Sequence, residues 1–427
     1  MIVWLVTIGE PLPTDGVHVR LLRAGILAKE LVNAGHEVVW WTSTFDHTSK
    51  KQRSESSSVI QINDNYRIRL LHGRSYKNNV SIDRVANHRE VAAAFRISAD
   101  EEARPGVILS SYPTLELCKA SVDFGKQHGV PVAIDIRDLW PDVFVDLFPR
   151  MLRPLGYWLI RILRARVAST FQDADAFVGN SPGFVSWAQT LAGRGARDAD
   201  KVFPFGYSTE PVEEKLLGEA RKFWAGFGIH DEENTLVTCF FGTLGRQFDI
   251  ETVIKAAQLL EREERPFRFV LCGTGDRFED FKRQAAGCKS IVFPGWVGQA
   301  EIRTLMGMSR AGLAPYFSGV GFTANMPNKP IEYLSAGLPV VSSLKGHLET
   351  VLSAHNCGRT YANGDSAGLA DILRDLYDNS AETEVMSRNA RSLFQAEFAA
   401  GKIYPRFVEY LESLAAGERG SSMSGSN

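Results

Sequence analysis

The sequence has no strong excess of either charge. Its 427 residues include 48 Lys and Arg against 50 Asp and Glu, for a formal net charge of -2. A chain this close to neutral is not broadly basic, so we expect no nucleic-acid partner. Cysteine is scarce as well: the five cysteines are widely spaced and form no CxxC pair. This spacing argues against a disulfide framework and against a structural zinc site.

Long hydrophobic runs are also missing. No stretch reaches the roughly 18 apolar residues that suggest a membrane span. The first apolar run, Ile2 to Ile8, has no basic segment before it and no small-residue cleavage site after it. We therefore expect a cytoplasmic protein with reduced thiols, neither secreted nor membrane-spanning.

Apolar strand-like runs alternate with helical patterns along the chain, and the alternation restarts after Pro204. A chain of 427 residues with 44% hydrophobic content is too long for one ordinary core. The order predicts an α/β protein with two doubly wound domains and parallel sheets. The predicted strands are 2–8, 37–41, 66–71, 106–110, 131–136, 176–179, 235–241, 267–272, 291–294, 311–314 and 338–342, and the predicted helices are 19–34, 250–263 and a stretch from 366 onward.

Three glycine-containing turns follow predicted strands, where doubly wound sheets bind ligands. The first is 9–16, with Gly16 near the predicted start of the first helix. The second contains Gly242, Gly245 and Arg246, and the third contains Gly273 and Gly275. Each turn alone is explained by loop geometry, but together they favour phosphate binding. Arg246 adds a guanidinium that suits a bidentate contact with phosphate.

The segment 327–341, PNKPIEYLSAGLPVV, is the most informative stretch. Two prolines precede a helix predicted from Ile331 to Ala336, and Gly337 ends it. Free N–H groups at the helix start and Lys329 would attract a diphosphate, and Glu332 would accept hydrogen bonds from sugar hydroxyls. The alternative is a surface helix with a solvated Lys329 and Glu332 in its first turn.

Several segments together resemble one known family. In the second half these are FFGTLGRQFDIETVIKAA, FVLCGTGDRFEDFKR, VFPGWVGQAEI and PNKPIEYLSAGLPVV, and in the first half AGHEVVWWTS, AIDIRDLWPD, DADAFVGNSPGF and VFPFGYS. Over roughly residues 1 to 412 the chain resembles glycosyltransferase family 4, the retaining enzymes with the GT-B fold, and most closely the bacterial branch that builds surface polysaccharides.

The resemblance implies two Rossmann-like domains that face a cleft. The N-terminal, acceptor-side domain would span 1–208 and the C-terminal, nucleotide-sugar-binding domain 209–395. A helix at 396–415 would return to the first domain, and 416–427 would form a disordered tail. The implied activity is transfer of a sugar from a nucleotide diphosphate sugar, a UDP-sugar, to a lipid-linked or glycan acceptor.

The resemblance also implies roles for single residues. Glu332 would hold the ribose hydroxyls, and Arg246 and Lys329 would neutralise the diphosphate. The further substrate-binding positions implied are Gly16 and Gly242 to Gly245 beside the phosphates, Gly273 and Gly275 on the nucleotide side, Trp296 and Val297 beside the base, and Asn328. One departure matters: many members carry a glutamate where this chain has Ala324, which leaves the donor sugar open.

Retention without a metal or other cofactor requires cations and backbone dipoles to stabilise the leaving diphosphate. A phosphate oxygen would accept the acceptor's proton in a same-face displacement, so a dedicated base is not required. Asp138 is the alternative catalytic carboxylate, unless it caps the next turn or pairs with Arg137. His18 would reach phosphate or acceptor, or would be a solvated residue at a helix start. The two DxD sequences, at 173–175 and 198–200, are not at strand ends, so we expect no metal site.

Residues 148–166 form a basic and apolar segment, in which arginines 150, 153, 161, 164 and 166 interleave with leucines, isoleucines and Trp158. This interleaving favours contact with the inner membrane surface, where a polyprenyl-diphosphate-linked sugar acceptor would lie. The protein would then be peripheral on the inner face of the plasma membrane. The alternative is a core-packed helix with its arginines in water.

Other function classes stay open. A nucleotide-sugar 2-epimerase has the same two-domain fold and would release free sugar without an acceptor. A non-catalytic sugar-nucleotide-binding subunit would do neither. An NAD-dependent enzyme is disfavoured, because neither half has the full glycine fingerprint followed by a matched acidic residue.

Overall fold

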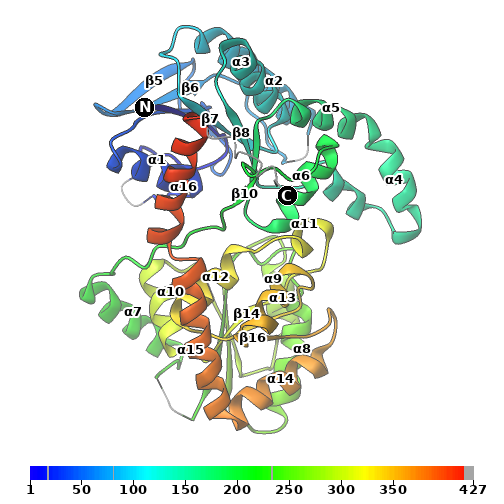
Figure 1. Ribbon diagram of the computed structural model, residues 1–427. Coiled ribbons are helices and arrows are strands. Elements are labelled where there is room, and N and C mark those ends of the chain that lie inside the picture. The colour runs from blue at the N-terminus through cyan, green and yellow to red at the C-terminus, as the bar shows by residue number, and fades with distance from the viewer. Residues whose placement is uncertain (17–18, 80, 232–233, 418–427) are drawn as a thin grey trace, which may run out of the picture. The chain divides into compact units, whose positions relative to one another are not determined.

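The computed structural model describes residues 1–16, 19–79, 81–231 and 234–417. The chain divides into two compact units: residues 1–206 with the C-terminal segment from 401, and residues 207–400. Figure 1 shows that each unit is a sheet with helices on both faces. Both are α/β units with mainly parallel sheets, as the sequence predicts.

The N-terminal unit has a sheet of order β10-β9-β8-β7-β1-β2-β6-β5, in which only β5 runs antiparallel to its neighbour. Its strands are β1 Ile2–Val6, β2 Glu37–Ser43, β5 Ser58–Asn63, β6 Tyr66–Leu71, β7 Val107–Tyr112, β8 Val132–Ile136, β9 Ala176–Gly179 and β10 Lys201–Val202, with a small hairpin of β3 Phe45–Asp46 and β4 Lys51–Gln52. Its helices are α1 Arg23–Asn33, α2 Ile82–Ala99, α3 Leu115–His128, α4 Arg153–Leu159, α5 Arg161–Gln172, α6 Pro182–Ala192 and α16 Ala400–Ala415, and two short 3-10 helices cover Asp142–Leu147 and Arg150–Leu152.

The C-terminal unit has an all-parallel sheet of order β13-β12-β11-β14-β15-β16. Its strands are β11 Leu236–Phe241, β12 Phe267–Cys272, β13 Ile291–Gly295, β14 Ala311–Ala314, β15 Val340–Ser342 and β16 Gly358–Thr360. Its helices are α7 Glu214–Gly226, α8 Ile250–Glu261, α9 Phe278–Gln284, α10 Gln299–Met308, α11 Val320–Thr323, α12 Asn328–Ala336, α13 His347–Ala354, α14 Ser366–Asp378 and α15 Ser380–Glu397.

Aromatic side chains fill the core of the N-terminal unit beside its central strands. The Trp4 ring lies 4.9 Å from that of Trp41 on the neighbouring strand and 4.8 Å from that of Phe124 on α3. All three side chains are buried. Large rings that pack against one another in this way hold α3 on the sheet, because each removes a large apolar area from water.

Two predicted helix starts are wrong. The first helix begins at Arg23 rather than at residue 19, so Gly16 lies in the preceding loop and not at the helix start. In the second half, α12 begins at Asn328 rather than at Ile331 and includes Pro330 in its first turn. Proline is tolerated there, because the first N–H groups of a helix have no partner within it. Gly337 does end this helix, with a φ of 75°.

Candidate functional site

Two glycine loops lie side by side in the C-terminal unit, after β11 and β12. The Gly242 N–H donates to the carbonyl of Cys272 at 3.0 Å, and the Leu244 N–H donates to that of Thr274 at 2.9 Å. A Cβ at Gly273 would lie 1.8 Å from the Gly242 oxygen. The loops approach this closely only because that position lacks a side chain.

Lys329 lies against the first of these loops. A Cβ on Gly242 would be 2.4 Å from the Lys329 Cε, and the Lys329 Nζ is 4.8 Å from the centre of the Phe248 ring. Lys329 also belongs to the first turn of α12, where backbone N–H groups already make the potential positive. A cation at this end of a helix is unfavourable by itself and creates a strong attraction for an anion.

Glu332 lies one turn further along α12 and is buried, with 7% of its surface exposed. The next residue, Tyr333, sets the position of the helix: its ring occupies the space that a Cβ on Gly312 would need, and its hydroxyl donates to the Leu313 carbonyl at 3.1 Å. Burial, with a smaller effect of Glu332, raises the pKa of Tyr316. The carboxylate therefore lies next to a tyrosine that stays neutral.

The other predicted donor-site residues of this unit lie nearer the surface. Arg246 is 87% exposed, and its Nε is 3.5 Å from a carboxylate oxygen of Asp276. Exposed pairs of this kind contribute little to stability. Trp296 is exposed in the loop after β13, whereas the adjacent Val297 is buried, and Asn328 is exposed at the start of α12.

The loop that carries Ala324, where the resemblance leads one to expect a glutamate, is tied to the rest of the unit. Ala324 directly follows α11. The backbone of Ser318 donates to the Asn363 side chain at 3.2 Å. A Cβ on Gly346 would lie 2.3 Å from the Thr323 oxygen, so this loop and the start of α13 are in close contact.

In the N-terminal unit, the predicted site residues have local roles. Arg53 forms a bidentate pair with Asp15, which tethers the loop that contains Gly16. His18 lies outside the described residues. The Asp138 Oδ1 accepts a hydrogen bond from the Leu139 N–H at 2.8 Å, and burial raises the pKa of this carboxyl. Hydrogen bonds with the Leu139 backbone and the Trp140 side chain oppose this rise, so the carboxylate is held by the turn that follows β8.

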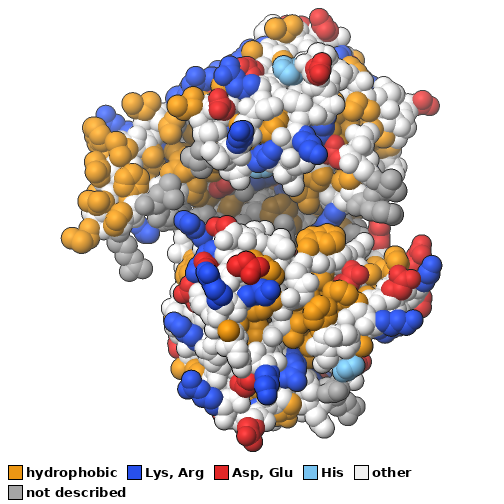
Figure 2. Space-filling model, turned by 180° about the vertical axis from the view of Figure 1, so that it is seen from behind, with side chains coloured by type: hydrophobic (Ala, Val, Ile, Leu, Met, Phe, Trp, Pro, Cys, Tyr) orange, Lys and Arg blue, Asp and Glu red, His pale blue; other side chains and the backbone are white. Residues whose placement is uncertain are grey.

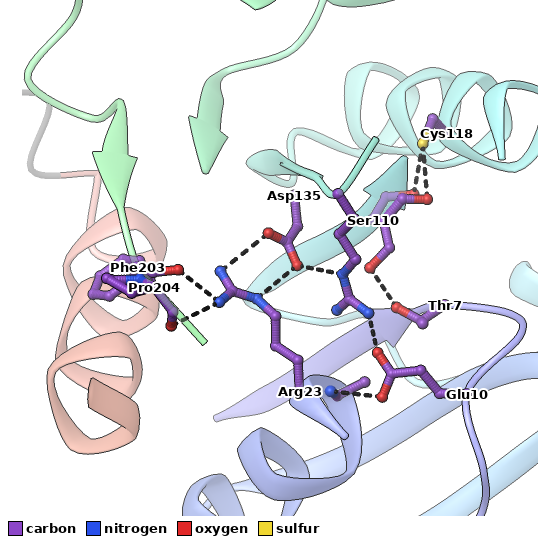
Figure 3. Close-up of polar contacts among 11 residues, drawn as sticks. Thr7, Glu10, Arg23, Ser110, Cys118, Asp135, Phe203 and Pro204 are labelled. Carbon is purple, nitrogen blue, oxygen red and sulfur yellow. Dashed lines mark hydrogen bonds and ion pairs between the residues drawn. The ribbon is translucent and has the colours of Figure 1, made fainter. Parts of the chain in front are cut away.

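A buried ionic network that the sequence analysis did not single out lies nearby. Arg23 forms a bidentate pair with Asp135, at 3.0 and 3.1 Å, and both side chains are 1% exposed. Its remaining Nη1 donates to the carbonyls of Phe203 and Pro204 (Figure 3). Arg137 donates to Asp135 rather than to Asp138. One guanidinium therefore ties α1 to β8 and to the segment after β10.

The two DxD sequences have structural partners. Asp173 pairs with Lys126 at 2.5 Å, and Asp175 accepts the Val132 N–H at 2.9 Å. Asp200 pairs with Arg194 at 2.7 Å. Within the described ranges, no three His, Cys, Asp or Glu side chains are placed to hold a metal ion.

Residues 151–163 form an exposed apolar surface, which we call the α4–α5 surface. Figure 2 shows these side chains gathered at the left of that view, where α4 and α5 project. The exposed apolar residues are Met151, Leu152, Leu155, Tyr157, Trp158, Leu159, Ile162 and Leu163. The core-packed alternative is therefore wrong for this segment. Arg164 pairs with Asp142, and Arg166 lies 3.5 Å from Glu116. None of the helices in the described part of the chain has the length and apolar character needed to cross a bilayer.

Comparison with known sequences finds a family match within the C-terminal unit. Residues 235–379 match the family described as "Glycosyl transferases group 1". The amylovoran biosynthesis glycosyltransferase AmsK of Erwinia amylovora is 27% identical over 168 residues, which cover 38% of this chain and 41% of AmsK. The aligned part thus spans about two fifths of that relative's length.

Comparison with solved structures covers nearly the whole chain. Sucrose-phosphate synthase from Thermosynechococcus elongatus has a TM-score of 0.70 at 17% identity, over 97% of this chain and 99% of that one. HepE of Anabaena, in complex with UDP-glucose, has a TM-score of 0.63 at 15% identity, over 97% and 100%. WaaG, a glycosyltransferase involved in lipopolysaccharide biosynthesis, has a TM-score of 0.64 at 14% identity, over 96% of this chain and 99% of that one. The chain therefore has the predicted GT-B fold, and its residues 235–379 match the group 1 glycosyltransferases.

Proposed function

We propose that this chain is a retaining, metal-independent glycosyltransferase of family 4 in surface-polysaccharide synthesis, with a UDP-sugar as donor. The observation that carries the proposal is the α12 start, where Lys329 lies against the Gly242 loop and the buried Glu332 follows one turn later. A cation at the positive end of a helix dipole suits a diphosphate, and a buried carboxylate suits ribose hydroxyls. HepE, which has a similar fold, binds UDP-glucose.

In this proposal the C-terminal unit binds the donor and the N-terminal unit binds the acceptor. The bond between the sugar C1 and the diphosphate oxygen breaks while a bond from the acceptor oxygen to C1 forms on the same face. The acceptor's proton passes to a phosphate oxygen. Lys329 stabilises the charge on the leaving diphosphate. The exposed Arg246 side chain turns from Asp276 to the diphosphate and adds a second positive charge there. On the acceptor side, Asp138 is the alternative carboxylate that would accept this proton.

The donor site is tested by nucleotide binding to Glu332→Gln, which keeps the size of the side chain. We expect UDP to stabilise the wild type in calorimetry and thermal unfolding more than GDP, ADP, CMP or NAD do. The variant should bind UDP at least about tenfold more weakly, because a hydrogen bond to a charged group contributes about 1.5–3 kcal/mol.

Glu384→Ala is the control, because that carboxylate is exposed on α15 and should leave UDP binding unchanged. A response to NAD alone, or equal UDP affinity of Glu332→Gln and wild type, would contradict the donor site. Turnover of a UDP-sugar without any acceptor would indicate the epimerase instead, and UDP-sugar binding without any turnover would indicate a non-catalytic subunit.

We further propose that the α4–α5 surface rests on the inner face of the plasma membrane, where a polyprenyl-diphosphate-linked sugar is the acceptor. Residues 149–166 contain five arginines and no acidic residue. Because Arg164 and Arg166 lie against Asp142 and Glu116, we assign the contact with anionic headgroups to Arg161. Arg161 is exposed, while Met151, Trp158 and Ile162 are 92%, 61% and 72% exposed and available to enter the acyl boundary.

Replacing Met151, Trp158 and Ile162 together by Ser should abolish sedimentation with phosphatidylglycerol and phosphatidylethanolamine vesicles. Each buried side chain of this size contributes about 1.5–3 kcal/mol, so we expect a loss of more than about a hundredfold. The matched control replaces Val59, Ile82 and Ile97, which are also exposed, by Ser. Equal vesicle binding by the two triple variants would contradict membrane contact through this surface.

A further inference from the structure

Four basic side chains gather around Tyr76 in the N-terminal unit: His47, Lys50, Arg84 and His88. His47 and Lys50 come from the β3–β4 hairpin, and Arg84 and His88 come from α2. The Lys50 Nζ is 4.9 Å and the Arg84 Cζ 6.0 Å from the centre of the Tyr76 ring. His47 Nδ1 is hydrogen-bonded to the Tyr76 hydroxyl at 2.7 Å. We call this set the Tyr76 cluster.

The two cations of the Tyr76 cluster have no salt-bridge partner among the described residues. Lys50 donates to the side-chain oxygen of Asn79 and Arg84 donates to its backbone carbonyl, each at 2.6 Å. Two carboxylates face the cluster but are engaged elsewhere. Asp46 accepts hydrogen bonds from Ser49 and Thr48, and Asp138 accepts one from Leu139. Asp46 is also shared with Arg53, at 3.7 Å, and burial raises the pKa of Asp138, so these two carboxylates balance Lys50 and Arg84 only in part.

One buried donor atom in the Tyr76 cluster lacks a hydrogen-bond partner in the described part of the chain. The Arg84 Nε is buried and makes no hydrogen bond. The His88 side chain, on the same helix, is 5% exposed and also makes none with the described residues. Buried polar groups are nearly always paired in folded proteins, so exceptions need a reason. The buried Arg84 Nε, next to Lys50 and the His88 imidazole, indicates that an anion completes the set.

The backbone and the electrostatics agree with this interpretation. Lys50 has a φ of 59°, a conformation that side chains disfavour and that occurs often at functional sites. Burial and then the neighbouring cations lower the pKa of His47, and burial with Arg84 lowers that of His88 to about 3. An anion among these groups would relieve the repulsion between like charges.

The position in the fold also suits a ligand. Tyr76 follows β6, and the β3–β4 hairpin follows β2, so the Tyr76 cluster lies beyond the carboxyl ends of parallel strands. Trp140, from the loop after β8, places its ring 4.7 Å from the Arg84 Cζ. Doubly wound sheets bind their ligands beyond these strand ends.

We propose that the Tyr76 cluster is a binding site for a phosphoryl or diphosphoryl group. Lys50 and Arg84 pair with its oxygens, and the Arg84 Nε and His88 donate the remaining hydrogen bonds. That the group belongs to the diphosphate of a lipid-linked acceptor rests on the proposed transferase function. The same chemistry would bind free phosphate or pyrophosphate, so the site and its physiological ligand are tested separately.

The site is tested by titrating the full chain with inorganic pyrophosphate. The variant replaces Lys50 and Arg84 by Met, and its control replaces Lys51 and Arg89, exposed neighbours on the same hairpin and helix, by Met. Both double variants remove the same net charge. We expect pyrophosphate affinity to fall at least about tenfold in the first variant only, and pyrophosphate to shift the His47 and His88 imidazole NMR signals of the wild type.

Equal pyrophosphate affinity in both double variants, or no shift of the two imidazoles, would overturn the site. In a transfer assay, the first variant should raise KM for a polyprenyl-diphosphate sugar at least about tenfold and leave KM for the donor unchanged. If pyrophosphate binds as expected and no acceptor is glycosylated by the wild type, the site stands and the transferase proposal fails.

Discussion

Replacing Arg23 by Met should lower the free energy of unfolding of the N-terminal unit by about 3–5 kcal/mol, because it leaves two buried carboxylates, Asp135 and Glu10, with Arg137 as their one remaining cationic partner. Asp135 has no exposed surface and receives both hydrogen bonds of the Arg23 fork (Figure 3). The same change removes the donor of the Phe203 and Pro204 carbonyls. Urea unfolding followed by tryptophan fluorescence measures the effect, since six of the eight tryptophans lie in this unit.

Lys29→Met is the matched control, since Lys29 is an exposed cation on the same helix, and it should change stability by less than about 0.5 kcal/mol. A second variant, with Arg23→Met and Asp135→Leu together, should recover much of the loss, because Arg137 then stays paired with Glu10 and no buried charge is left uncompensated. If the double variant is as unstable as Arg23→Met, the lost carbonyl contacts are the cause and the ion pair is not.

The stability loss of Arg23→Met should depend on pH. Burial raises the pKa of Asp135, and Arg23 opposes that rise, so removal of the arginine raises the folded-state pKa further. At pH values between the Asp135 pKa of the unfolded chain, about 3.9, and the higher pKa of the folded variant, the folded variant binds more protons than its unfolded chain does. Its stability therefore falls as pH rises through this window. We expect the smallest deficit relative to wild type in acid and the full deficit above the variant's Asp135 pKa.

Contiguous features were predictable from the sequence. The strands β12 and β14 have the predicted bounds, because both are short apolar runs that are buried apart from Arg268 in β12. The antiparallel strand β5 was missed: its alternate residues are exposed, and it is rich in polar residues. The start of α12 was placed too late, because prolines were taken to precede the helix and one of them lies within its first turn.

Features assembled from distant segments were not predictable. Arg23 and Asp135 are 112 positions apart, and neither stands out in its own segment. Asp138, which the sequence suggested as the alternative catalytic carboxylate, is three residues from the carboxylate that accepts the Arg23 fork. The Tyr76 cluster draws on a hairpin, a loop and a helix, and nothing in a single sequence pairs these segments. By contrast, Lys329 and Glu332 lie on one short helix, so their spacing alone indicated a possible site.

Replacing Lys329 by Met should lower the rate of sugar transfer about a hundredfold to a thousandfold, the usual loss when one group that stabilises developing charge is removed. Lys329 is half-buried against the Gly242 loop, so its charge acts on a diphosphate with little screening by water. Because this charge matters most as the leaving group forms, kcat should fall more than KM for the donor rises. Steady-state kinetics with a UDP-sugar and an acceptor measure both.

The Lys255→Met variant is the control, since Lys255 is exposed on α8 and should keep the wild-type rate. Gly242→Ala tests the placement of the lysine, because its Cβ would lie 2.4 Å from the Lys329 Cε and push the side chain away. It should lower kcat on its own and add little to Lys329→Met, since both changes disturb one interaction. Full additivity would mean that Gly242 acts through the backbone of its loop, and an unchanged rate in Lys329→Met would exclude the lysine from the chemistry.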